Sequence, residues 1–270
     1  MSPERPPALA GNFYPDDSLE LERRIAALLD SPPPGTPLRI DPERIRAVVV
    51  PHGDMLRAGT VQAMAYRILK TRRKPPARLL LLGPLHTGSS YGIVLPTYPS
   101  SFRIPTGSFP VDRAAIRQLA GFAETLFSDE SHEFEHSIET QLPFLMALWG
   151  GLPIVPVGYS DITANVLFRV LEPLMNDPET LTICSADFSH YFSAEKASRI
   201  DQATVDRILS GGEVDRLESC GAIGINALNH LAHQFGTLPS LLTLSHSGAA
   251  TGETGQVIGY AAIAYSQPRR

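Results

Sequence analysis

The sequence has few of the features that mark secreted or membrane proteins. Its 270 residues include only two cysteines, Cys184 and Cys220, and a single tryptophan. No run approaches the roughly 20 apolar residues that a transmembrane helix needs, and the first residues, MSPERPPALAG, lack the charged and then apolar pattern of a signal peptide. We therefore expect a cytoplasmic protein without membrane association, in which a reducing environment favours free thiols or a metal ligand over a disulfide.

The chain also lacks the excess of positive charge that is typical of nucleic-acid-binding proteins. Lys and Arg number 23 against 28 Asp and Glu, which gives a formal net charge of −5. The one basic cluster, Arg72 to Lys74, precedes Pro75 and Pro76 and has the character of a solvated loop. Nothing in this charge distribution favours nucleic acid as a partner.

What the sequence does contain is a series of short apolar runs, which are typical of strands buried on both faces. They lie at 46–50 (RAVVV), 78–83 (RLLLLG), 153–158 (PIVPVG), 180–185 (TLTICS) and 256–265 (QVIGYAAIAY). Helical patterns alternate with them, at 18–29, 61–70, 113–122, 137–149, 162–174 and 197–209. This alternation predicts a single α/β domain over residues 1–270, with a central mixed or largely parallel sheet flanked by helices.

Polar side chains directly follow three of these runs. His52 comes after the first run, His86 after the second, and Asp187 and His190 after the fourth. In open α/β sheets ligands bind beyond the carboxyl ends of the strands, so we expect these groups to converge on one pocket. Each histidine alone would more often be a hydrogen-bonded surface or packing residue. Neutral imidazoles are nevertheless common metal ligands, and two of them with one anionic ligand leave open positions for a substrate and oxygen.

Cys220 is a candidate for the anionic ligand. It precedes a helical pattern that runs from Ala222 to Phe235, and a helix N-terminus favours a thiolate. The alternative interpretation, of equal weight, makes Cys220 a small buried cap residue. Cys184 lies within the apolar run TLTICS and is expected in the core.

The stretch HEFEH, which begins at His132, matches the H-E-x-x-H motif of zinc peptidases. Such a site needs a third ligand. The metzincin continuation would place glycine and histidine where this chain has Glu139 and Leu142, and the following helix offers only Glu172, at an unsuitable distance. We therefore expect that His132 does not chelate, and that His136 faces the pocket as a catalytic or substrate-contacting group.

A set of longer motifs extends along nearly the whole chain. In order they are RPPALAGNFYP, VVVPH, LLGPLH, HEFEHSIETQLPFL, CSADFSHY, SCG and SGAATGETGQVIGYAA. In their order and approximate spacing the chain resembles the Memo family from about Arg5 to Tyr265. Bacterial and archaeal members of this family are called AmmeMemoRadiSam system protein B, and the family is similar in fold to LigB-type class III extradiol dioxygenases.

The resemblance implies a metal site at matching positions. His52 and His86 correspond to the two histidine ligands of the family and Cys220 to its cysteine ligand, with iron or copper as the expected ion. His190 corresponds to the histidine that acts as acid and base in the related dioxygenases. Thiolate is softer than the carboxylate of those enzymes, which favours copper(I) or a different redox balance of iron.

Further residues border the same pocket according to the resemblance. Asp187, His136 and Glu139 fall in motifs that line it. Where the family usually reads P-H-A-G-Y, this chain has PHGDM, which places Asp54 and Met55 at the edge of the substrate pocket. The segments FRIPTG and LSHSGA also depart from the usual motifs.

The function implied by the resemblance is that of a non-haem, metal-dependent oxidoreductase related to the dioxygenases and acting on an unknown small molecule. The alternative is a non-catalytic metal-binding module that holds a peptide or partner and works with AMMECR1-like and radical SAM proteins.

Overall fold

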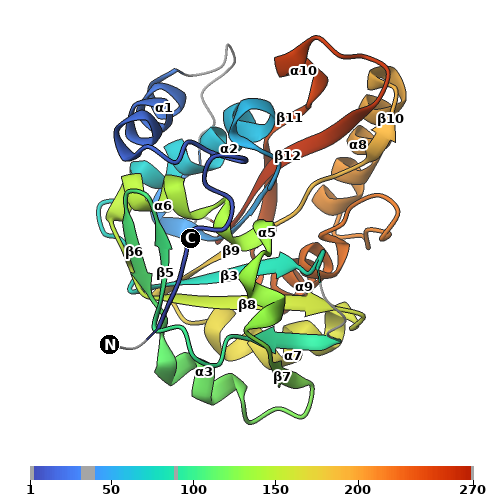
Figure 1. Cartoon of the computed structure of the whole chain (residues 1–270). Coiled ribbons are helices and arrows are strands. Elements are labelled where there is room, and N and C mark those ends of the chain that lie inside the picture. The colour runs from blue at the N-terminus through green and yellow to red at the C-terminus, as the bar shows by residue number, and fades with distance from the viewer. Residues whose placement is uncertain (1–2, 32–39, 88–90, 269–270) are drawn as a thin grey trace.

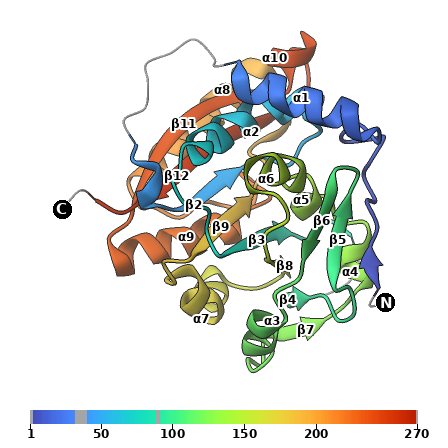
Figure 2. The ribbon, with the colours of Figure 1, turned by 90° about the vertical axis from the view of Figure 1, so that its left-hand side faces the viewer.

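A mixed β-sheet forms the centre of the protein, as Figures 1 and 2 show. The computed structural model describes residues 3–31, 40–87 and 91–268. The middle of the sheet consists of parallel strands in the order β2 (Ile45–Val50), β9 (Thr180–Ser185), β3 (Arg78–Pro84) and β8 (Ile154–Ser160). The carboxyl ends of these strands therefore lie at one edge of the sheet, where the sequence predicted a pocket.

Further strands extend the sheet on both sides of this parallel core. They are β12 (Val257–Ser266), β11 (Leu238–His246) and β10 (His190–Phe192) beyond β2, and β4 (Gly92–Leu95) and β7 (Thr125–Phe127) beyond β8. β12 runs antiparallel to β2, and β4 runs antiparallel to β8. A smaller sheet is formed by β1 (Glu4–Arg5), β5 (Ser101–Ile104) and β6 (Gly107–Pro110). The mixed sheet confirms the predicted α/β fold class.

Helices cover both faces of the large sheet. They are α1 (Ser18–Asp30), α2 (Met55–Lys70), α3 (Arg113–Leu119), α4 (Glu130–Glu133), α5 (His136–Glu139), α6 (Leu142–Trp149), α7 (Ala164–Met175), α8 (Ala194–Leu209), α9 (Ala222–Phe235) and α10 (Gly248–Thr251), with a 3-10 turn at Pro42–Arg44. In Figures 1 and 2, α1, α2 and α6 lie together on one face, while α7 and α9 pack against each other on the opposite face. No helix in the described ranges is long and apolar enough to cross a membrane.

The strands form where the sequence predicted them because their side chains are apolar on both faces. Every residue of β2 and of β9 is buried. The helices agree less closely with the prediction. The helix expected at 61–70 begins at Met55, where Asp54 caps it, and the helix expected at 137–149 is broken into α5 and α6, with Pro143 in the first turn of the latter. This break lets His136 and the following turn lie across the end of β3.

A buried ion pair attaches the N-terminal segment to α5. Arg5 pairs with Glu139, and the two side chains are 4% and 0% exposed. Glu139 also accepts a hydrogen bond from the hydroxyl of Tyr14. Two further hydrogen bonds come from the backbone N–H groups of Ala8, at 3.1 Å, and Leu9, at 2.9 Å. All of the acceptor capacity of this carboxylate is therefore directed at the N-terminal segment.

We expect Arg5→Met to lower the free energy of unfolding by about 3 kcal/mol, because it leaves the buried charge of Glu139 without its cation. Arg24→Met is the matched control, since Arg24 pairs with Glu20 on the exposed face of α1 and its loss should cost less than about 1 kcal/mol. Urea unfolding measures both. Equal losses in the two variants would contradict a stabilising role for the buried pair.

Candidate metal centre

Three imidazoles meet beyond the carboxyl ends of the parallel strands. His52 follows β2, His86 follows β3, and His136 is the first residue of α5. The ring of His52 lies 5.0 Å from that of His86 and 5.0 Å from that of His136, and the latter two rings are 4.3 Å apart. One ligand atom from each residue lies within 4.8 Å of the others, so this group could hold a metal ion.

Glu135 is held between two of these imidazoles. Its Oε1 accepts from Nδ1 of His86 at 3.1 Å and lies 3.3 Å from Nδ1 of His136. The same carboxylate accepts the backbone N–H groups of His86, at 2.6 Å, and Ser137, at 2.9 Å. Because an ionised carboxylate can only accept, His86 carries a proton on Nδ1 and leaves Nε2 free to bind an ion, and the nearby carboxylate oxygen favours the same tautomer in His136. One side chain thus acts on two candidate ligands.

A chain of buried hydrogen bonds fixes His52. Its Nδ1 lies 2.9 Å from Oγ of Ser185, which accepts from the side-chain amide of Gln141 at 3.1 Å. The amide nitrogen also donates to the carbonyl of Pro51 at 3.0 Å, and Tyr66 donates to the amide oxygen at 2.7 Å. These partners allow only one orientation of the amide. With its Nδ1 facing Ser185, His52 also keeps Nε2 for an ion.

Burial favours the neutral form of two of these imidazoles. It lowers the pKa of His52 well below its ordinary value, and His86 and His136 lower it further. Burial likewise lowers the pKa of His136. For Glu135, burial raises the pKa, but the hydrogen bond and charge of His86 outweigh it and bring the pKa to about 2. Neutral imidazoles at His52 and His136 beside an ionised Glu135 carboxylate favour the binding of a cation.

Cys220 approaches the cluster beside His52. Its Sγ lies 3.4 Å from Nε2 of His52 and accepts from the backbone N–H of Asp187 at 3.3 Å. The residue stands just before Gly221, the N-cap of α9, as the sequence predicted. Burial, and then the charge of Asp187, nevertheless raises the pKa of the thiol. The effect of burial on the pKa of the thiol outweighs that of the helix N-terminus, so only a bound cation would favour the thiolate.

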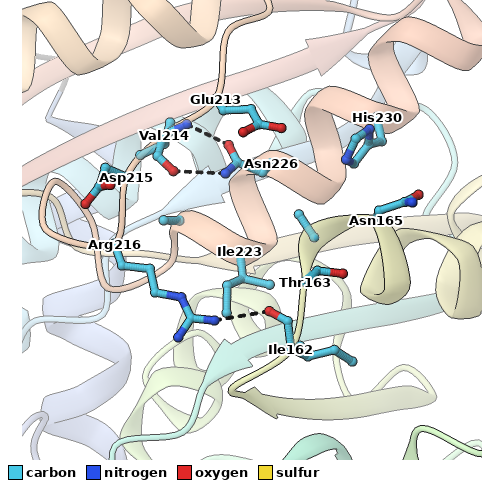
Figure 3. A pocket seen from close by; sticks show the side chains of 12 residues that line it. Ile162, Thr163, Asn165, Glu213, Val214, Asp215, Arg216, Ile223, Asn226 and His230 are labelled. Atoms are coloured by element: carbon cyan, nitrogen blue, oxygen red, sulfur yellow. Dashed lines mark hydrogen bonds between the residues drawn. The ribbon is translucent and has the colours of Figure 1, made fainter.

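The loop before Cys220 is attached to α9 by Asn226. Its side-chain oxygen accepts from the backbone N–H of Val214 at 2.8 Å, and its nitrogen donates to the carbonyl of Val214 at 2.9 Å (Figure 3). The loop, α9 and the start of α7 line a cavity of about 710 Å³. None of the three imidazoles is among its described lining residues, so this cavity is separate from the candidate metal centre.

Asp187, which the sequence placed at the pocket, holds the loop of His52. Its Oδ1 accepts from the backbone N–H of His52 at 2.8 Å, and its Oδ2 lies 3.8 Å from Nε2 of the same residue. Burial raises the pKa of this carboxyl group to about 7, against the hydrogen bond from His52. The ring of His190 packs against Tyr191 at 5.8 Å. Burial lowers the pKa of His190, a hydrogen bond with the backbone of Phe188 raises it, and the charge of His86 lowers it.

The first histidine of HEFEH is separated from the second. Nε2 of His132 lies 3.0 Å from the carbonyl oxygen of Val94, and its ring packs edge-on against Phe102. Burial lowers its pKa to about 4. His132 is a core residue that donates to a backbone carbonyl, and only His136 of this motif joins the metal-binding group.

The three residues predicted to line the substrate pocket each have a defined place in the fold. Asp54 caps α2, Met55 is buried at the start of that helix, and Glu139 binds the N-terminal segment. Asp54 and Met55 line a cavity of about 400 Å³ together with Phe13. The ring of Phe13 packs on His136 at 5.3 Å, so this cavity adjoins the cluster through an aromatic side chain.

Three residues that hold the cluster were not predicted from the sequence: Glu135, Ser185 and Gln141. The signal for Glu135 was its place directly before His136, in a segment otherwise chosen for its histidines. Ser185 and Gln141 are polar residues at the ends of apolar patterns, a position too common to single them out.

The fold and the cluster define a class of protein: an α/β domain with a candidate mononuclear metal centre beyond its parallel strands. Residues 5–264 match the family model described as Memo-like protein, and the chain therefore belongs to the Memo family. A MEMO1 family protein of Metallosphaera sedula is 31% identical, with 97% of this chain and 99% of the relative covered. A MEMO1 family protein of Methanopyrus kandleri is 32% identical, with 97% and 99% covered.

The solved structures show the fold alone. An uncharacterized protein of Escherichia coli K12 superimposes with a TM-score of 0.51 at 13% sequence identity, covering 81% of this chain and 98% of that one. The family membership predicted from the motifs is thus confirmed by the sequence comparisons, independently of this structural likeness.

We expect Glu135→Gln to weaken binding of Zn²⁺, used as a probe ion, by about 10- to 100-fold, because an amide cannot accept as a carboxylate does from both imidazoles. Glu133→Gln is the matched control, since Glu133 is exposed in the same segment. Competition with a chromogenic chelator measures the affinity. Unchanged affinity in a folded Glu135→Gln protein would show that the carboxylate does not orient the ligands.

Proposed function

We propose that this protein is a non-haem metal-dependent oxidoreductase whose ion is iron or copper. The observation that carries the proposal is the convergence of three imidazoles whose Nδ1 atoms each have a protein partner, which leaves their Nε2 atoms available to one ion. Such pre-oriented ligands are typical of metal centres rather than of packing histidines.

The donor set suits a redox metal. We assign His52 and His86 as ligands, with Cys220 as the anionic ligand and His136 at the remaining protein position. Nitrogen and sulfur ligands at about 2.1 and 2.3 Å from one ion lie roughly 3 to 3.6 Å apart at bond angles of about 90 to 110°. Sγ of Cys220 is 3.4 Å from Nε2 of His52, so both atoms could bind one ion that keeps further positions for a substrate. A mixed imidazole and thiolate set favours copper or iron over hard cations such as Mg²⁺.

When bound, the ion would supply a Lewis-acidic, redox-active centre for a small substrate or dioxygen. The protein groups around it have distinct tasks in this proposal. Asp187 holds the His52 loop through the backbone, and His190, a neutral imidazole near the cluster, moves a proton to or from the substrate. Phe13 packs on His136 and would exclude water from that side.

Metal analysis tests the site. We expect His52→Ala and Cys220→Ser to lose most of the iron or copper that the purified wild-type protein carries, because each removes a ligand. His233→Ala, in which an exposed histidine on α9 is removed, and Cys184→Ala, in which a buried core cysteine is removed, are the controls and should retain the metal. Full metal content in His52→Ala and Cys220→Ser would refute the ligand assignment.

Oxygen uptake tests the chemistry. We expect metal-loaded protein to consume oxygen with at least one member of a panel of catechols and other phenols, and His190→Gln to lower the rate by about 100-fold or more while leaving the metal content unchanged. Metal-loaded protein without turnover, purified together with an AMMECR1-like or radical SAM protein, would instead favour the binding-module alternative.

A further inference from the structure

The turn that carries His190 is held by β12 and by one side chain from α8. Between β9 and β10, the backbone N–H of Phe188 donates to the carbonyl of Gly259 at 2.8 Å, and the N–H of Gly259 donates to the carbonyl of Ser189 at 2.8 Å. The N–H of Ser189 faces the other way. Its acceptor is Oδ1 of Asp201, at 2.9 Å.

Asp201 is an unusual residue to find in this place. It lies on α8 with only 1% of its surface exposed, and burial raises the pKa of its carboxyl group. Burying a carboxylate is unfavourable unless it is hydrogen-bonded or paired. Among the described residues Oδ2 of Asp201 makes no hydrogen bond. The hydroxyl of Ser189 is also without a partner there and lowers the pKa of the carboxyl group, so the backbone N–H of Ser189 alone does not explain why a carboxylate stands here.

Gly259 makes room for this carboxylate. A Cβ at position 259 would lie 1.9 Å from Oδ2 of Asp201, so the carboxylate would have to move to admit it. In the sheet Gly259 is paired with His246 of β11. Directly paired residues of antiparallel strands place their side chains on the same face, with Cβ atoms about 5 Å apart. His246 therefore stands beside the carboxylate that occupies the space over Gly259.

His246 has a free polar atom that matches the one on Asp201. Its Nδ1 is buried and makes no hydrogen bond within the described part of the chain. The charge of His246 also acts on Asp201, in the direction that opposes the effect of burial. Two unpartnered buried groups of complementary chemistry thus lie side by side under the Ser189–His190 peptide.

We propose that Asp201, backed by His246, is a positioning residue that sets the orientation of His190 at the metal centre. The inference rests on the proposed function of His190. Tyr191, the next residue, has a φ of +64°, a conformation that side chains other than glycine adopt only under constraint. Asp201 supplies a constraint of this kind, because it binds the N–H two residues earlier and sheet pairing alone leaves that group without an acceptor.

Titration of His190 in the full-length protein tests the proposal. The apparent pKa of His190 is followed by NMR with labelled histidine, and the signal is assigned with His190→Gln. We expect Asp201→Ala to move this pKa toward its ordinary value by about half a unit or more, because the ring loses its buried position. Asp201→Asn should shift it by less than half as much, since the amide can still accept from Ser189 and donate to His246. Asp206→Asn, an exposed change on the same helix, should have no effect.

Gly259→Ala gives a second route to the same result. The added Cβ displaces the carboxylate without removing it, so we expect a shift in the direction seen with Asp201→Ala. In the double variant Asp201→Ala, Gly259→Ala the Cβ has space, and the two shifts should not add. If the alanine variants do not fold, the wild-type protein still tests the contact: the amide proton of Ser189 should exchange slowly, and rapid exchange would overturn the proposal.

Metal content separates this inference from the proposed function. Because Asp201 contacts no proposed ligand, we expect Asp201→Ala to keep the metal content of the wild type. If the purified wild-type protein contained no iron or copper, the proposed function would be refuted. A shifted pKa of His190 in Asp201→Ala would still support the positioning role. An unchanged titration in folded Asp201→Ala and Gly259→Ala proteins, with normal metal content, would remove only the role of Asp201.

Discussion

The candidate centre depends on one buried carboxylate, that of Glu135, which must be satisfied by donors from two separate parts of the chain. Its donors come from His86, two residues after β3, and from the start of α5, so the two elements must lie in contact. Gly83 makes this approach possible, because a Cβ there would lie 2.2 Å from Oγ of Ser137. The positions of the imidazoles thus depend on the buried carboxylate of Glu135, which needs hydrogen-bond donors, and on Gly83, which permits close packing.

Glu139 is the last residue of α5, four positions after Glu135, which caps the start of the same helix. It binds the N-terminal segment through Arg5, Tyr14 and two backbone N–H groups. The same segment brings Phe13 onto His136. Two carboxylates on one short stretch therefore connect the imidazole cluster to the N-terminal segment. The same stretch orients the imidazoles through Glu135 and holds Phe13 against His136 through Glu139.

Much of this arrangement could be read from the sequence, and the rest could not for identifiable reasons. The apolar runs predicted the strands, and the histidines after two of them predicted where the site lies, since strand ends converge by topology. The motif context placed His136 near the pocket. The role of Glu139 was not predictable, because a glutamate that faces a pocket and one that binds a distant arginine look alike in sequence. Glu135 and Asp201 likewise act through contacts that only the folded chain brings together.

Arg5 and Glu139 are separated by 134 positions in the chain. At a synthesis rate of about 5 to 20 residues per second, roughly 7 to 27 s pass between the appearance of the arginine and that of its partner. During this interval Arg5 has no partner at Glu139 to pair with. The segment around Arg5 can pack on α5 only after the middle of the chain has been made, and until then its basic and apolar side chains are accessible to chaperones and proteases.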